Sequence, residues 1–127
     1  MNNKGFTLKK RLQSFIYAFN GIRFLIKNEH NAWIHSFATI CVIIAGFYYK
    51  LSQMEWIAII LAIGCVFASE AINSSIEALS DLVSPEYNQS IKHTKDLAAA
   101  AVLFLAIAAA IIGSIIFIPK IITTCQL

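Results

Sequence analysis

The feature that most constrains this chain is an apolar run of 22 residues, from Leu97 to Ile118, in which Ser114 has the only polar side chain. A helix needs about 20 apolar residues to cross the hydrocarbon core of a bilayer. The run therefore predicts a membrane-spanning helix over 97–118. We expect this helix to end at Pro119, because proline cannot donate the next backbone hydrogen bond of a helix.

Composition agrees with a membrane protein. Of the 127 residues, 58% are hydrophobic and 13% are charged, whereas soluble domains have about 45–50% apolar and about 25% charged residues. The length suits a single domain over 1–127. The net charge of +3 is too small to indicate nucleic-acid binding. We therefore expect an all-α membrane protein with no nucleic-acid partner.

Two further stretches predict spans over 32–49 and 56–82. The first is interrupted by His35, Ser36 and Thr39, and the second becomes polar after Ala68 while keeping a helical pattern. Polar groups at such depth are tolerated where they face protein or water rather than lipid. A short turn over 50–55 and a polar loop over 83–94 would connect the three spans.

The N-terminal segment, 6–27, has a different pattern. Its apolar residues recur at helical spacing and are accompanied by five cations, which is typical of an amphipathic helix lying on an anionic membrane surface. Its apolar positions are Leu12, Phe15, Ile16, Phe19, Ile22 and Ile26, and its cations are Lys9, Lys10, Arg11, Arg23 and Lys27.

The distribution of cations predicts the orientation. Eight Lys and Arg residues either precede the first span or lie between the second and third, against two on the other side. Cytoplasmic loops carry the excess of Lys and Arg, so the N-terminus and the second loop should be cytoplasmic. The eight are Lys4, Lys9, Lys10, Arg11, Arg23, Lys27, Lys92 and Lys95, and the two are Lys50 and Lys120.

Polar residues of the second span gather on one face. The set Glu70, Asn73, Ser74, Glu77 and Asp81 covers an arc of about 100° on a helix. Burying one carboxylate in a membrane costs about 2.5 kcal/mol or more, and neighbouring carboxylates repel unless they are protonated or bridged by a cation. Mg²⁺ is the natural bridging ion, because it binds carboxylate oxygens together with phosphates. Polar contacts between helices, or a transporter or proton pathway, would use the same face.

The sequence lacks the motifs of the common nucleotide-binding folds. No GxxxxGK[ST] run is present, and the five glycines are scattered along the chain. Phosphoryl transfer by such a chain would therefore depend on a metal held by carboxylates, with Lys or Arg nearby.

Two motifs carry a resemblance to a known family. The run EAINSSIEALSD at 70–81 and the run KDLAAAAV at 95–102 resemble the signature of the small prokaryotic diacylglycerol kinases. The likeness extends from about Gly5 to Ile118. It implies a homotrimeric lipid kinase of the bacterial inner membrane, with its active site on the cytoplasmic side. The implied reaction moves the γ-phosphate of ATP, with Mg²⁺ as cofactor, to the hydroxyl of a membrane lipid.

The resemblance also implies roles for individual residues. Glu70 resembles the family's general base, and Glu29 and Glu77 resemble its metal ligands. The residues that resemble nucleotide contacts are Lys10, Tyr17, Glu29, Glu77, Glu86, Asn88, Lys95 and Asp96. Those that resemble the lipid site are Glu70, Asn73 and Ala99.

The start of the first span bears on the choice of lipid. The best-known branch of the family, which converts diacylglycerol to phosphatidic acid, has a Phe-Arg-Gln-Glu run there. This chain has Ala32-Trp33-Ile34-His35 instead. A histidine at this place resembles the undecaprenol kinase branch, which makes undecaprenyl phosphate. An interfacial histidine that only forms a hydrogen bond would explain the residue equally well. We expect diacylglycerol as the substrate, with undecaprenol as the alternative.

Overall fold

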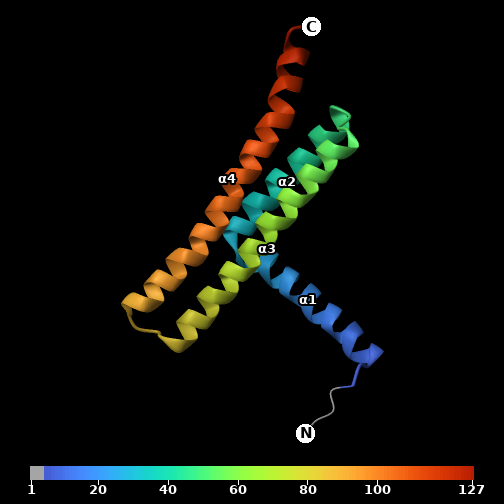
Figure 1. The fold of residues 1–127 in the computed structure, drawn as a ribbon. Coiled ribbons are helices and arrows are strands. Elements are labelled where there is room, and N and C mark those ends of the chain that lie inside the picture. Colours follow the sequence, from blue (N-terminus) through green and yellow to red (C-terminus); the bar gives the residue numbers. More distant parts are fainter. Residues whose placement is uncertain (1–4) are drawn as a thin grey trace.

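The computed structural model describes residues 5–127 and consists of four helices joined by short connections (Figure 1). The elements are α1 (Leu8–Asn28), α2 (His30–Tyr48), α3 (Gln53–Val83) and α4 (Gln89–Cys125). The expected all-helical architecture is confirmed over this range. One cation of the sequence-based count, Lys4, lies outside the described residues.

The three helices α2, α3 and α4 run side by side, whereas α1 leaves this bundle at an angle (Figure 1). Each of the three is long and apolar enough to cross a membrane, so a helix that could span stands at each of the three expected spans. At about 1.5 Å per residue, the 31 residues of α3 and the 37 of α4 are longer than the roughly 30 Å of a hydrocarbon core. Parts of both helices therefore extend beyond it.

The connection between α2 and α3 is closed by local interactions, and we call this region the turn end (residues 46–59 with Ile116 and Lys120). Ser52 caps α3: its side chain accepts a hydrogen bond from the backbone N–H of Glu55, and the Glu55 carboxylate accepts one from the backbone N–H of Ser52. Such a reciprocal pair satisfies two backbone donors that a helix start leaves open. Lys120 of α4 lies 3.1 Å from the Glu55 carboxylate.

The buried core of a single chain is small. It lies at the turn end, where Leu51, Ile59 and Ile116 pack together. Most large apolar side chains of the three spanning helices are exposed in the single chain. Lipid or further copies of the chain would have to cover them, since water does not solvate such a surface favourably.

The helix that contains the third predicted span is longer than expected at both ends. α4 begins at Gln89, and only residues 84–88 connect it to α3 rather than the expected loop over 83–94. Asn88 explains the early start, because its Oδ1 accepts hydrogen bonds from the backbone N–H groups of Ser90 and Ile91 at 2.9 and 3.2 Å.

The expectation that this helix ends at Pro119 is also wrong, since α4 continues to Cys125. A proline removes a single backbone hydrogen bond, and membrane helices tolerate it where other groups compensate. Here Lys120 is anchored to Glu55, and the Thr123 hydroxyl donates to the Pro119 carbonyl at 2.9 Å. These contacts hold the last helical turns in place beyond the proline.

A single residue joins α1 to α2. Glu29 has extended backbone angles (φ −104°, ψ 116°), and its backbone N–H donates to the Leu25 carbonyl at 3.0 Å. Across this joint, the Trp33 indole N–H donates to the Ile26 carbonyl. The joint places Glu29, one of the expected metal ligands, at the point where α1 leaves the bundle.

Candidate active site

Glu70 is the most deeply buried large side chain of the described residues, with 1% of its surface exposed. It lies on α3, and its Oε1 is 3.1 Å from the Nε2 of His35 on α2. A buried carboxylate needs such a partner, because an uncompensated charge in an apolar environment is costly. The expected catalytic residue is therefore found inside the helix bundle, paired with one side chain of a neighbouring helix.

Two polar atoms close to Glu70 in sequence are buried without a partner. Within residues 5–127, neither the Oδ1 of Asn73 nor the Oγ of Ser74 has a hydrogen-bond partner. Ser69 differs, because its buried hydroxyl donates to the Val66 carbonyl at 2.7 Å. Leaving a buried polar group unpaired costs about 1–3 kcal/mol. The two orphan atoms are therefore suited to receive hydrogen bonds from a ligand.

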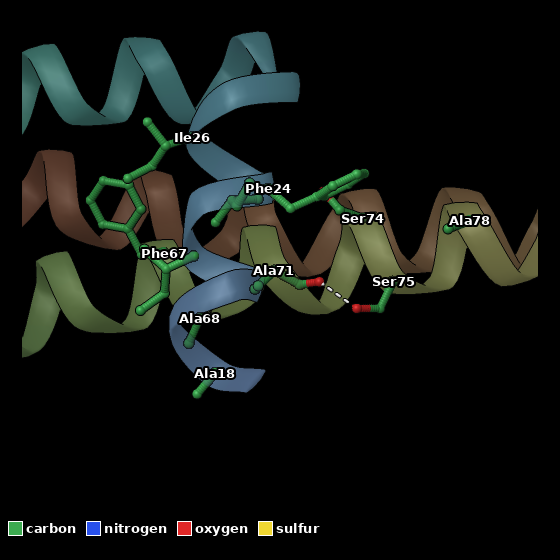
Figure 2. A pocket seen from close by; sticks show the side chains of 12 residues that line it. Ala18, Phe24, Ile26, Phe67, Ala68, Ala71, Ser74, Ser75 and Ala78 are labelled. Carbon is green, nitrogen blue, oxygen red and sulfur yellow. Dashed lines mark hydrogen bonds between the residues drawn. The ribbon is translucent and has the colours of Figure 1, made fainter. Parts of the chain in front are cut away.

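A groove of about 720 Å³ lies between α1 and α3. Figure 2 shows its lining side chains, which include Phe24 of α1 together with Phe67, Ala71 and Ser74 of α3. Phe67 also packs edge-on against the ring of His35, with the ring centroids 6.4 Å apart. The groove is thus mostly apolar, and Phe67 connects its wall to the ring of His35.

Charged side chains gather where α3 and α4 approach their connection. Lys95 donates to the Asp81 carboxylate at 2.9 Å, which links the two helices. Glu77 also attracts Lys95 electrostatically. One turn away, Lys92 binds Asp96 at 2.6 Å. Lys95, expected to contact a nucleotide, therefore lies among carboxylates from the polar face of α3.

The other expected site residues are more open to solvent. Glu29 and Glu77 are half-buried, and the remaining ones are exposed: Lys10, Tyr17, Glu86, Asn88, Asp96 and Ala99. Lys10 and Tyr17 lie on α1, whereas Glu86 and Asn88 belong to the connection before α4. The single chain therefore brings together Glu70 with Asn73 and Glu77 with Lys95, and leaves the others on separate surfaces.

The metal expectation concerns two carboxylates. Over residues 5–127, no group of three or more His, Cys, Asp or Glu side chains could hold a metal ion by itself. Two carboxylates completed by phosphate oxygens are nevertheless a donor set that Mg²⁺ accepts. Glu29 and Glu77 each carry donors of this kind and are half-buried, Glu29 at the joint between α1 and α2 and Glu77 on α3.

Sequence reasoning missed the link between His35 and Glu70. In the sequence, His35 resembles a feature of one branch of the family, and the residues around it do not indicate that Glu70 is its partner. One signal was present: the midpoint between the two positions falls at residues 52–53, where the turn from α2 meets the start of α3. Antiparallel helices place such residues at similar depth, so a histidine and a carboxylate there are candidates for a pair.

Comparison with known proteins identifies relatives of this chain. Residues 16–117 match the family model described as "Prokaryotic diacylglycerol kinase". Over 113 residues the chain is 39% identical to a protein named "Undecaprenol kinase" from Bacillus subtilis (strain 168), covering 89% of this chain and 92% of the relative.

Two relatives are named "Diacylglycerol kinase". The first, from Synechocystis sp. (strain ATCC 27184 / PCC 6803 / Kazusa), is 34% identical over 113 residues, covering 88% of this chain and 65% of the relative. The second, from Escherichia coli (strain K12), is 27% identical over 110 residues, covering 87% of this chain and 88% of the relative.

Three apolar helices, a buried carboxylate on one of them and these matches define a membrane-embedded lipid kinase. The chain belongs to the prokaryotic diacylglycerol kinase family, and the resemblance found in the sequence is confirmed. Family membership favours the enzyme over the transporter that the carboxylates alone left open.

Proposed function

We propose that this chain transfers the γ-phosphate of MgATP to the hydroxyl of a membrane lipid, with Glu70 as the general base. The observation that carries the proposal is the burial of Glu70 on α3, the helix that also forms one wall of the groove. A carboxylate at that depth is expensive, and intramembrane ionisable residues of this kind mark functional sites. In the proposed step, the lipid oxygen bonds to the γ-phosphorus, the bond to the β–γ bridging oxygen breaks, and the hydroxyl proton passes to Glu70.

The phosphates are assigned to the charged region between α3 and α4. Glu29 and Glu77 would hold Mg²⁺, which offsets the charge of the phosphates when it is bound. Lys95 is one of two lysines in this region and is held by Asp81, and Lys92 lies one turn away. The other proposed nucleotide contacts lie on exposed surfaces of α1, α4 and the connection between α3 and α4: Lys10, Tyr17, Glu86, Asn88 and Asp96.

The lipid is assigned to the groove between α1 and α3. Its apolar walls suit a hydrocarbon chain, and the orphan Oγ of Ser74 and Oδ1 of Asn73 can accept hydrogen bonds from a polar headgroup. Ala99, carried over from the resemblance, has a small side chain and would contact the headgroup. In this arrangement the hydroxyl reaches Glu70 while the chain stays in lipid.

Two lipid alcohols are candidates for the groove. Diacylglycerol follows from the family description and from the names of two relatives. Undecaprenol is favoured by the 39% identical relative, which bears the name "Undecaprenol kinase", and by His35, which stands in place of the glutamate of the diacylglycerol branch. We propose undecaprenol as the preferred substrate and diacylglycerol as the second candidate.

Sidedness and assembly complete the proposal. The excess of cations on one side favours a cytoplasmic N-terminus and active site in the inner membrane of a bacterium, with α1 lying on the membrane surface. The exposed surface of α4 includes small residues, among them Ala99, Ala101 and Ala108, which permit close helix contacts. These features support a homotrimer.

A radiolabel assay in mixed micelles tests the proposal. Purified protein receives [γ-³²P]ATP and Mg²⁺, with undecaprenol and diacylglycerol offered side by side and the Glu70→Gln variant as control. Labelled undecaprenyl phosphate as the main product is the expected outcome. Predominant phosphatidic acid would favour diacylglycerol, and no labelled lipid from either alcohol would refute the function.

A further inference from the structure

The pair formed by Glu70 and His35 is more than a generic polar contact, because the proposed role of Glu70 as a base fixes which of the two atoms donates. The Nε2 of His35 lies 3.1 Å from the Oε1 of Glu70, and the two side chains are 23% and 2% exposed. An ionised carboxylate has only acceptor sites. A general base must be ionised before it takes a proton, so Nε2 has to carry the hydrogen in the state that starts the reaction.

The surroundings leave Glu70 as the polar partner of the imidazole. Phe67 of α3 lies edge-on to the His35 ring, at an interplanar angle of 73°. A cavity of about 270 Å³ between α2, α3 and α4 adjoins the ring, and the part of its wall that α4 supplies consists of Ala106, Ala109, Ala110 and Gly113. None of these side chains can compete for the hydrogen of Nε2.

We propose that His35 is a positioning residue for the phosphoryl transfer. Its Nε2–H holds Oε1 of Glu70, which fixes the plane of the carboxylate and leaves Oε2 to accept the proton of the lipid hydroxyl. This inference rests on the proposed role of Glu70 as the base. Fixing a reacting group in a productive geometry is a substantial part of a catalytic rate enhancement.

A purely structural role for the pair predicts something different. If the hydrogen bond only ties α2 to α3, its loss lowers the stability of the bundle, and the turnover of the folded fraction stays the same. If His35 positions Glu70, the loss appears in kcat, while the KM values for lipid and MgATP change little.

A matched pair of variants separates these roles. In His35→Gln the amide nitrogen stands four bonds from Cα, as Nε2 does in histidine, so it can donate to Glu70. In His35→Asn the same amide is one bond shorter and falls short. Both variants are assayed in mixed micelles with labelled MgATP and a lipid alcohol at saturating concentration, and kcat is normalised to the folded fraction.

We expect His35→Gln to keep kcat within a few-fold of the parent chain. His35→Asn should lose about tenfold or more, which is part of the roughly 10²–10⁴-fold that a positioned base contributes. Equal kcat in His35→Asn and the parent would overturn the inference. Should His35→Asn fail to fold, the kcat of His35→Leu, whose side chain fills a similar volume without a donor, decides in the same way.

A second background distinguishes failure of this inference from failure of the proposed base. In Glu70→Gln, the further change His35→Asn should produce no additional loss, because the group it positions is already absent. If Glu70→Gln itself turns over normally, the role of Glu70 fails and the inference fails with it. If Glu70→Gln is inactive while His35→Asn is fully active, the role of Glu70 stands and the inference alone is refuted.

Discussion

Polar groups in the two halves of α3 differ in how many hydrogen-bond partners they have. At the turn end, the Glu55 carboxylate has two partners: the backbone N–H of Ser52, the N-cap residue of α3, and the side chain of Lys120 on α4. Further along the same helix, Glu70 has one partner, and the buried polar atoms of Asn73 and Ser74 have none within residues 5–127. Buried polar groups with satisfied hydrogen bonds stabilise a fold, whereas unsatisfied ones are available to a ligand. The comparison assigns the turn end to stability and the polar face of α3 to function.

Two of the three glutamates of α3, Glu55 and Glu70, give the largest contrast. Glu70→Gln should lower kcat by about 10²–10⁴-fold, because the amide cannot accept the proton of the lipid hydroxyl. Glu55→Gln should leave kcat unchanged and lower the thermal stability. Turnover and thermal unfolding of both variants in the same micelles check the contrast. Comparable kcat losses in the two variants would remove it.

Gly46 tests whether packing dominates at the turn end. A Cβ at this position would lie 2.5 Å from the Trp56 ring, so an alanine forces the indole to move. We expect Gly46→Ala to lower the free energy of unfolding by about 1–3 kcal/mol, in the range of overpacked cores. Its kcat per folded molecule should equal that of the parent chain. Chemical denaturation followed by Trp fluorescence measures the change, and Gly64→Ala, which meets no neighbour within 4 Å, is the control.

Ser74 tests whether the orphan polar atoms serve a ligand at the expense of stability. Ser74→Ala removes a buried hydroxyl that has no partner, so the free energy of unfolding should rise by up to about 1 kcal/mol. The KM for the lipid should rise as well. Ser69→Ala, which removes a partnered hydroxyl, is the control and should destabilise without affecting the lipid KM. A Ser74→Ala variant that is destabilised, with normal lipid kinetics, would contradict the comparison.

Lys120 gives the smallest expected effect. Its ion pair with Glu55 is partly exposed, and such pairs contribute little to stability because water and salt screen them. Lys120→Met should therefore shift the melting temperature less than Gly46→Ala does, and turnover should be unaffected. A scan at low and high salt measures the shift, which should shrink as salt rises. A loss of turnover would connect the turn end to catalysis.

The sequence predicts the fold of this chain well where apolar runs are long. The span at 97–118 depends on transfer from water to lipid, a property that each residue carries with it, and the structure confirms a long apolar helix there. The ends of that helix depend on particular contacts instead. Asn88 caps the early start of the helix by accepting a hydrogen bond from Ser90. Beyond Pro119, Lys120 contacts Glu55. Composition reveals neither contact.

Within the candidate site, the sequence predicts the relative positions of residues on a single helix but not the contacts between helices. The spacing of Glu70, Asn73 and Glu77 places them on a common face because all three belong to α3. Contacts between helices, such as Glu70 with His35 and Asp81 with Lys95, depend on how the helices rotate and slide against one another. A single sequence does not specify that rotation and offset.

The one-residue joint at Glu29 leaves no slack between α1 and α2. A longer linker would let α1 reorient independently of the bundle, but here the Glu29 backbone N–H donates to Leu25, and the Trp33 indole donates to Ile26. Any tilt of α1 would therefore also displace the start of α2, which lies five residues before His35. The width of the groove and the position of Glu29 would then change together, because α1 forms one wall of the groove and is followed directly by Glu29.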